Sequence, residues 1–274
     1  MSFARNRLLM LCSRPEAEWD LAESALLIAS AEYEGLDPRE GLAMLDVLAR
    51  DAAPHLPASG DRERAEALAR YLHVEQRFDG NHERYDDPRN SYLNDVLERR
   101  KGLPILLSLV YCEVGARVGV PFQGVGLPGH FIVKIPEPVE TFFDPFHGGK
   151  VLSVEECSAR VREVYAGELS FRAEMLRPAT PREILMRILR NLKDLFTAGD
   201  DLHRAWRTTD LMLCVDPSAS DPLRDRGLLA IQLGDYRSGA GDLSRYLALW
   251  PKAPDRALVE ESLRRARVAI ATLN

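Results

Sequence analysis

The chain has 274 residues, of which 46% are hydrophobic and 28% are charged, and its formal net charge is -6. This length is enough for one large domain or two modest ones with a buried core, and the composition is that of a globular protein. The acidic balance argues against general nucleic-acid binding, and the longest apolar stretch, LPILLSLVYC, is too short to span a bilayer.

The cysteine usage indicates a reducing compartment. Four cysteines, Cys12, Cys112, Cys157 and Cys214, are widely separated and form no CxxC pair. Such spacing predicts free thiols in a cytoplasmic protein, with neither a disulfide framework nor a zinc knuckle. The apolar run LLMLC near the N-terminus is shorter than the hydrophobic region of a secretion signal, which also favours a cytoplasmic protein.

Residues 15–78 are predicted to be helical. Apolar residues recur at helical spacing over 16–35, 36–53 and 60–78. In the second of these helices Asp37 is the expected N-cap and Pro38 the first helical residue.

The next segment, DGNHERYDDPRNSYLNDVLERRKG, is polar and rich in Asn, Asp and Gly, as a structured loop is. Its second half predicts a short helix that is capped by Asn90 or Ser91 and ended by Gly102. A role in the loop structure is expected for Asn81, Asp87 and Asn90. The alternative is that these polar side chains and the cations of ERRKG line the rim of a cleft.

The helix that follows, LPILLSLVYCEVGARVG, is apolar almost all round and is therefore expected at the centre of the core. Beyond Gly119 the pattern changes to short apolar runs between turn residues, which predicts strands. These strands are expected within 121–136, 140–146 and 150–153, and a further helix within 154–167. The two prolines of RPATPRE predict a domain boundary near residue 180.

Residues 181–274 contain a repeat. Two helical patterns each end in proline, and these prolines, Pro217 and Pro251, are 34 residues apart. That is the period of the tetratricopeptide helical hairpin. We therefore expect antiparallel helix pairs over 181–272, with four side chains buried between the helices: Leu233, Tyr236, Leu243 and Leu247.

One histidine and one aspartate are placed as in a catalytic dyad. His130 stands at the head of an alternating apolar run, and Asp144 ends the next candidate strand. A hairpin would bring the two into hydrogen-bond contact, so that the carboxylate fixes the imidazole tautomer and leaves the other ring nitrogen as a base. The alternative is a purely structural hydrogen bond at the end of a sheet.

The sequence offers no well-placed nucleophile for this dyad. Cys112 is the nearest thiol, but it lies about two turns inside the apolar helix, where burial raises a thiol pKa. Ser108 also lies beyond the first residues of this helix. The head of the helix reads GLPI and contains neither a thiol nor a hydroxyl. A buried, structural role is therefore expected for Cys112.

Neither a cofactor nor a metal ion is expected from the motifs. The chain has no GxGxxG or GxxxxGK[ST] loop for a nucleotide, and no HxH or HExxH motif for a metal. His147 and Asp144 are close to His130 in the sequence, but their spacing alone does not predict a metal site.

The order of these features resembles a known family. A helix after KG, a strand headed by His130 and a strand that ends in DP are similar to the papain-like core of transglutaminases. The segment from FDGNHERYDDPRN to GLPGHFIVKI resembles more specifically the SirB-one family of transglutaminase-like proteins. This resemblance covers roughly residues 20–180, and a tetratricopeptide-like tail is also usual in that family.

The resemblance implies an α+β fold for residues 1–180, with N-terminal helices and a degenerate transglutaminase-like core in which a buried helix packs on a small antiparallel sheet. An all-α tetratricopeptide-like module is implied for residues 181–274. His130 and Asp144 match the base and the orienting acid of the family's Cys–His–Asp triad. The family's cysteine falls near Leu103 or Pro104 and is absent.

Without that cysteine the covalent route of acyl transfer is lost. The expected function is therefore a non-catalytic cytoplasmic interaction or regulatory protein with protein partners, and with neither nucleic acid nor membrane as a partner. The alternative is an enzyme, namely an amidase, acyltransferase or cysteine-peptidase-like protein. It would use His130 and Asp144 together with Cys112, Ser108 or an activated water.

Overall fold

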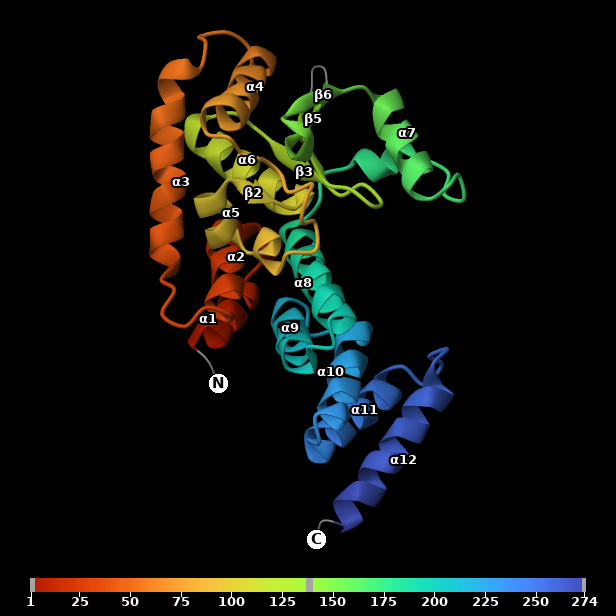
Figure 1. The fold of residues 1–274 in the computed structure, drawn as a ribbon. Helices are drawn as coiled ribbons and strands as arrows, with labels where there is room; N and C mark the ends of the chain where they lie inside the picture. The colour runs from red at the N-terminus through yellow and green to blue at the C-terminus, as the bar shows by residue number, and fades with distance from the viewer. Residues whose placement is uncertain (1–2, 137–139, 273–274) are drawn as a thin grey trace. The chain divides into compact units, whose positions relative to one another are not determined.

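The structure is a computed structural model that describes residues 3–136 and 140–272. Its contacts divide the chain into two compact units. The first consists of Met1–Arg7 and Arg14–Ile188, and the second of Leu8–Ser13 and Leu189–Asn274. Figure 1 shows the path of the chain and the labels of its helices and strands.

The first unit combines helices with two small sheets (Figure 1). Its α-helices are α1 Phe3–Cys12, α2 Leu21–Ser30, α3 Pro38–Ala52, α4 Asp61–Arg70, α5 Leu93–Arg99, α6 Pro104–Val118, α7 Val154–Val164 and α8 Pro181–Ala198, of which α1 and α8 also contribute residues to the second unit. A π-helical turn, Tyr71–Glu75, follows α4, and 3-10 helices occur at Glu16–Glu18, Ala53–His55, Pro88–Ser91, Pro145–His147 and Ala173–Leu176. Asp37 caps α3 through its side chain and Pro38 is the first residue of that helix, as predicted.

The ends of α5 differ from the prediction. Neither Asn90 nor Ser91 caps this helix, because both lie in the preceding 3-10 helix, and the N-cap position is Tyr92. The Asn90 side chain is bound to backbone carbonyls of the loop, so it does not reach the helix amides. The helix ends at Arg99 and its C-cap is Arg100, which has a left-handed conformation (φ 60°); the predicted end, Gly102, lies in a strand.

The two sheets contain the predicted strands and one further pair. Strands β1 Asp79–Gly80 and β2 Lys101–Gly102 pair in parallel, whereas β3 Gln123–Val125, β4 Ile132–Ile135, β5 Thr141–Asp144 and β6 Lys150–Leu152 form an antiparallel sheet in that order. The sequence places His130 at the head of a strand, but β4 begins two residues later. The reason is a turn in which the His130 N–H donates to the carbonyl of Leu127.

Both faces of the antiparallel sheet are covered. Helix α6 contacts β3 and β4, and its residues from Pro104 to Tyr111 are all buried, as predicted for a central helix. On the opposite face, Ile132 and Phe142 belong to a core cluster that also contains side chains of α7. Because the sheet is packed on both sides, residues at its ends are held in defined positions.

The second unit is helical and has the predicted hairpin organisation. After α8 it contains α9 Leu202–Val215, α10 Ser220–Gln232, α11 Tyr236–Leu249 and α12 Arg256–Thr272. Successive helices contact one another along the chain, α9 with α10, α10 with α11 and α11 with α12. Over residues 3–136 and 140–272, no helix has both the length and the apolar character that a membrane span requires.

The four side chains that were expected between these helices are buried to different degrees. Leu243 is fully buried, and Leu247 packs against the same cluster with part of its surface exposed. Leu233 and Tyr236 are only half-buried. The buried tyrosine is Tyr246, which lies three residues after Leu243 and hence on the same face of α11, whereas Tyr236 is the first residue of that helix.

Close packing of α10 on α11 predicts that Gly227 does not tolerate a side chain. A β-carbon added there would lie 2.7 Å from Cδ2 of Leu243. We expect Gly227→Ala to lower the free energy of unfolding by about 1–3 kcal/mol, the usual cost of overfilling a packed core. Urea unfolding of the full chain measures this change.

Gly241→Ala in α11 is the matched control, because no atom lies within 4 Å of the added carbon. Alanine favours the helix over glycine, so this variant should be as stable as the parent or more stable by up to about 1 kcal/mol. Equal effects of the two substitutions would contradict the packing of α10 on α11.

Candidate functional site

His130 and Asp144 meet at one end of the antiparallel sheet. His130 Nε2 lies 3.0 Å from Asp144 Oδ1, which confirms the predicted hydrogen bond. His130 precedes β4 and Asp144 is the last residue of β5, so the pairing of these two strands brings the side chains together. Both are buried, with 7% of His130 and 0% of Asp144 exposed.

This contact allows a tautomer of His130 that would suit catalysis. When Nε2–H donates to the carboxylate, Nδ1 carries the lone pair, which is the arrangement that a general base needs. Asp144 also has a local structural task. Its Oδ1 accepts a hydrogen bond from the Phe146 N–H at 3.2 Å and caps the 3-10 helix Pro145–His147. The carboxylate therefore serves the fold as well as the histidine.

Two further side chains complete what we call the Asp144 cluster, which consists of His130, Asp144, His147 and Arg160. Nη1 of Arg160 lies 2.9 Å from Asp144 Oδ2, and His147 Nδ1 lies 2.8 Å from the same oxygen. His147 is close to Asp144 in the sequence, but neither its contact with this carboxylate nor that of Arg160 was predicted. The three-residue spacing of Asp144 and His147 was a usable signal, whereas Arg160 belongs to α7 and no local pattern connects it to the sheet.

The cluster keeps a buried carboxylate ionised. Burial by itself raises the pKa of Asp144, but the hydrogen bond and charge of His130 and the charge of Arg160 outweigh it and lower this pKa below the ordinary aspartate value. A buried anion of this kind is stable only when donors and counter-charges surround it.

The head of α6 is connected to this cluster through a short series of contacts. Gly102, two residues before Pro104, pairs with Gly80 in the parallel ladder. Phe146 packs on Gly80, where an added β-carbon would lie 2.6 Å from the Phe146 carbonyl oxygen. The ring of His130 lies 6.1 Å from the ring of Phe146. The family resemblance implies that His130 faces the head of α6 directly, and this orientation stays a prediction.

Neither residue at the head of α6 can act as a nucleophile. The N-cap residue is Leu103 and the first helical residue is Pro104. Their side chains carry no hydroxyl, thiol or amine. Proline also lacks the backbone N–H that could stabilise an oxyanion.

The two candidate nucleophiles farther along α6 are poorly suited to attack. They follow Pro104 by four and eight residues, which places them about 6 and 12 Å along the helix axis. Ser108 is fully buried, and within the described residues its hydroxyl has no hydrogen-bond partner. Cys112 is half-buried rather than fully buried as predicted, because the C-terminal turns of α6 approach the surface. Burial, together with the charge of Glu113, still raises the pKa of its thiol to about 12.

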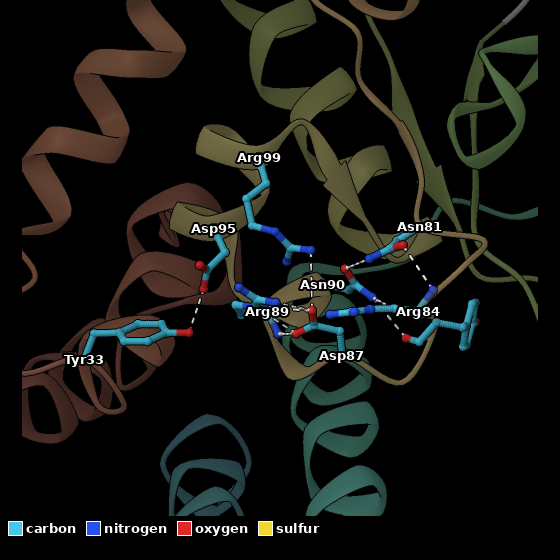
Figure 2. Close-up of polar contacts among 9 residues, drawn as sticks. Tyr33, Asn81, Arg84, Asp87, Arg89, Asn90, Asp95 and Arg99 are labelled. Atoms are coloured by element: carbon cyan, nitrogen blue, oxygen red, sulfur yellow. Dashed lines mark hydrogen bonds and ion pairs between the residues drawn. The ribbon is translucent and has the colours of Figure 1, made fainter.

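The polar loop before α5 binds its own side chains. Figure 2 shows Asn90 among the loop residues, and its side chain is fully buried. The Asn90 amide donates to the carbonyl of Arg84 at 2.6 Å and to that of Tyr85 at 3.1 Å, and Oδ1 accepts from the Asn81 amide at 2.9 Å. The predicted loop-structural roles of Asn81 and Asn90 are thereby confirmed.

Asp87 holds the next turn of the same loop (Figure 2). Its carboxylate accepts from the Arg89 N–H at 3.0 Å and so caps the 3-10 helix Pro88–Ser91. It also forms ion pairs with Arg89 at 2.8 Å and Arg99 at 3.5 Å. The hydrogen bond from the Arg89 side chain is the largest influence on the pKa of Asp87, which lies below the ordinary aspartate value. Asp87 therefore also has the structural role that was predicted.

The cations of ERRKG are likewise engaged within the fold. Arg99 pairs with Asp87, and Lys101 Nζ lies 3.1 Å from Asp79 Oδ2. The Arg100 guanidinium lies over the ring of Phe78, 4.6 Å from its centroid. These contacts favour a structural role over the cleft-rim alternative.

A hollow of about 650 Å³ lies away from the Asp144 cluster, between α3, the start of α4 and the end of α6. Two of its arginines already have partners, since Arg64 donates to the carbonyl of Val118 and Arg117 pairs with Asp46. No member of the Asp144 cluster lines this hollow. It is therefore separate from the His130–Asp144 pair.

Comparison with known proteins agrees with this architecture. The family model of the transglutaminase-like superfamily matches residues 39–190, and that of the tetratricopeptide repeat matches residues 192–264. A UPF0162 protein of Xylella fastidiosa is 41% identical over 253 residues, which cover 89% of this chain and 88% of the relative. The UPF0162 protein PA3419 of Pseudomonas aeruginosa is 31% identical, with 84% of each chain covered.

A eukaryotic protein shares part of the sequence. F-box only protein 21 of Pongo abelii is 30% identical over 194 residues, which are 66% of this chain but 30% of that protein. The fold and the family matches define a transglutaminase-like protein with C-terminal tetratricopeptide repeats. The chain belongs to the UPF0162 family, which is the SirB-one type of transglutaminase-like protein that its sequence resembles.

The contacts of Asn90 predict that this side chain stabilises the loop. Asn90→Ala would remove two hydrogen bonds to loop carbonyls and the one from the Asn81 amide, so we expect the free energy of unfolding to fall by about 2–3 kcal/mol. Arg84→Ala is the control, because the Arg84 side chain is exposed and the backbone carbonyl that Asn90 binds is retained. Thermal and urea unfolding measure both, and a stable Asn90→Ala protein would refute the structural role.

Proposed function

We propose that this protein is a non-catalytic cytoplasmic interaction or regulatory protein, in which a transglutaminase-like core without a nucleophile is joined to a tetratricopeptide-like interaction module. The observation that carries this proposal is the head of α6, where Leu103 and Pro104 stand in place of a cysteine. Acyl transfer through a covalent intermediate requires an ionisable nucleophile in contact with the base. Neither of these side chains can supply one.

The second unit supports an interaction role. Tetratricopeptide repeats generally mediate protein–protein interactions through the surfaces of stacked helix pairs. Three apolar side chains of α11 and α12 are strongly exposed, with 54% for Leu249, 63% for Leu258 and 64% for Val268. Exposed apolar surface of this kind suits a protein partner. The net charge of -6 disfavours nucleic acid as a partner, and we propose neither nucleic acid nor membrane.

The second candidate function is an amidase or acyltransferase. One observation favours it, namely the hydrogen bond of 3.0 Å between His130 and Asp144, which leaves Nδ1 of the imidazole as a base when Nε2 carries the proton. Such an enzyme would need Cys112, Ser108 or an activated water as its nucleophile. The raised pKa of Cys112 and the complete burial of Ser108 are the reasons why we place this function second.

The non-catalytic proposal predicts that the thiol of Cys112 does not react in the folded protein near neutral pH. Because burial raises its thiol pKa to about 12, the reactive thiolate forms only in strongly alkaline solution. We expect no alkylation of Cys112 by iodoacetamide near neutral pH, and no incorporation of a fluorescent amine into a glutamine peptide. Mass spectrometry of the labelled peptides and fluorescence of the amine product measure the two reactions.

Unfolded protein in denaturant is the positive control, because all four thiols should then react with iodoacetamide. In unfolded Cys112→Ala only three thiols should react. A transamidation activity that disappears in a folded Cys112→Ala variant would establish the enzyme and end the non-catalytic proposal.

The interaction role predicts that exposed apolar residues of the second unit are needed to bind a partner. Leu258→Asp should leave the fold intact, because surface substitutions usually change stability by less than about 0.5 kcal/mol. We expect proteins captured by the tagged full chain from its own cells to be lost with this variant. Quantitative mass spectrometry of the captured proteins provides the measurement.

Val74→Asp is the matched control, because Val74 is 62% exposed but lies in the first unit. Capture by this variant should equal that of the parent chain. If the parent enriches no protein, or if Leu258→Asp and the parent capture the same proteins equally well, the interaction role of this surface is excluded.

A further inference from the structure

Three metal-ligating side chains converge within the Asp144 cluster. His130 offers Nε2, His147 offers Nδ1 and Asp144 offers a carboxylate oxygen, and these atoms all lie within 4.8 Å of one another. The nearest ligand atoms are 2.8 Å apart for His147 and Asp144, and 3.0 Å apart for His130 and Asp144. Two imidazoles and one carboxylate form a ligand set that is well known for zinc and related ions.

The spacing suits a small divalent ion after a modest adjustment. Zinc binds imidazole nitrogen at about 2.0–2.1 Å, so two ligands at a tetrahedral angle are about 3.3 Å apart. The two imidazole–carboxylate separations are slightly shorter than this. His147 is the residue that can adjust, because its side chain is 41% exposed and it ends a three-residue 3-10 helix.

A cationic atom already occupies the point on which the ligand atoms converge. Nη1 of Arg160 lies 2.9 Å from Asp144 Oδ2, 3.1 Å from His130 Nε2 and 3.2 Å from His147 Nδ1. An N–H group at this point can donate to the carboxylate and to one unprotonated imidazole nitrogen. In this cluster, two imidazole nitrogens and a carboxylate oxygen, all potential metal ligands, thus surround a single positive charge.

Arg160 can leave this position without losing all compensation. It belongs to α7, and 25% of its side chain is exposed. Glu156 lies four residues earlier on the same helix, where it pairs with Lys150 at 2.7 Å and accepts from the Ser153 N–H. Its side chain is 44% exposed, so it can take Arg160 as a further partner at the helix surface. The ion pair that holds Arg160 inward is therefore exchangeable for contacts with water and Glu156.

We propose that the Asp144 cluster is a binding site for a divalent transition-metal ion of the zinc type, with His130 Nε2, His147 Nδ1 and a carboxylate oxygen of Asp144 as ligands. The ion takes the place of the Arg160 guanidinium, and water completes its coordination. Nitrogen donors favour Zn²⁺, Co²⁺ or Ni²⁺ over Mg²⁺ and Ca²⁺, which prefer oxygen. This site does not depend on the proposed interaction role, because metal binding leaves the head of α6 and the second unit unchanged.

The competing explanation is that Arg160 is a permanent counter-ion that fastens α7 to the sheet. The two explanations predict different behaviour of the parent chain. Under metal binding, the parent binds the ion, and Arg160→Ala, which removes a competing positive charge, binds it at least about tenfold more tightly. Under the permanent ion pair, the parent chain does not bind the ion.

Cobalt is the probe, since its visible absorption reports the geometry and donor atoms of a site. Full-length protein, purified in the presence of a chelator and then freed of it, is titrated with Co²⁺, and Zn²⁺ displacement is followed by calorimetry. We expect one saturable site in the parent chain, tighter binding in Arg160→Ala, and at least about tenfold weaker binding in His147→Ala. His203→Ala, which removes an exposed histidine of α9, should bind like the parent.

Circular dichroism verifies that each variant is folded, and Arg160→Gln replaces Arg160→Ala if the latter is not. The proposal is overturned if the parent chain does not bind Co²⁺ at millimolar concentration, even where the Arg160 variants do. It is also overturned if His147→Ala binds as tightly as the parent. A thiolate-to-cobalt charge-transfer band would assign the ion to a cysteine and would likewise reject this ligand set. None of these results bears on amine transfer or partner capture, so they leave the proposed function untouched.

Discussion

A carboxylate with no exposed surface must find its hydrogen bonds and counter-charges inside the protein, and Asp144 is such a group. It draws them from several elements: His130 before β4, the Phe146 N–H and His147 of the following 3-10 helix, and Arg160 of α7. One buried charge therefore connects the ends of β4 and β5, the 3-10 helix Pro145–His147 and α7. Each of these elements is positioned in part by that requirement.

Because of this constraint, a buried His–Asp pair can be required for stability alone, without any catalytic use. Breaking a buried charge network by removing one partner typically costs about 3–5 kcal/mol, whether or not the pair takes part in a reaction. The cysteine position at the head of α6 carries no comparable burden, since Leu103 and Pro104 fill it with apolar surface and a suitable first helical residue. The core can therefore require His130 and Asp144 for its stability although Leu103 and Pro104 stand at the head of α6.

The second unit is held together on different physical grounds. Its core consists of side chains from successive helices, such as Leu243 and Tyr246 of α11 with Val259 of α12. An ion-pair network reinforces this packing, because Arg226 of α10 pairs with Asp210 of α9 at 2.6 Å and with Asp242 of α11 at 2.7 Å. Interactions between neighbouring helices thus account for its cohesion, and apolar side chains on α11 and α12 are left at the surface for other contacts.

The sequence by itself determined the local features: the Asp37–Pro38 start of α3, the buried α6, the proline period of the repeats, and the His130–Asp144 contact. Caps and periodicity depend on residues a few positions apart, and a hairpin aligns the ends of two adjacent strands without help from the rest of the fold. Only the tertiary structure decided that Arg160 joins Asp144, that Asn90 binds loop carbonyls instead of capping α5, and that Cys112 is half-buried. These outcomes depend on which faces of separate elements pack together, and that choice is made by the burial of the whole core rather than by any short stretch of residues.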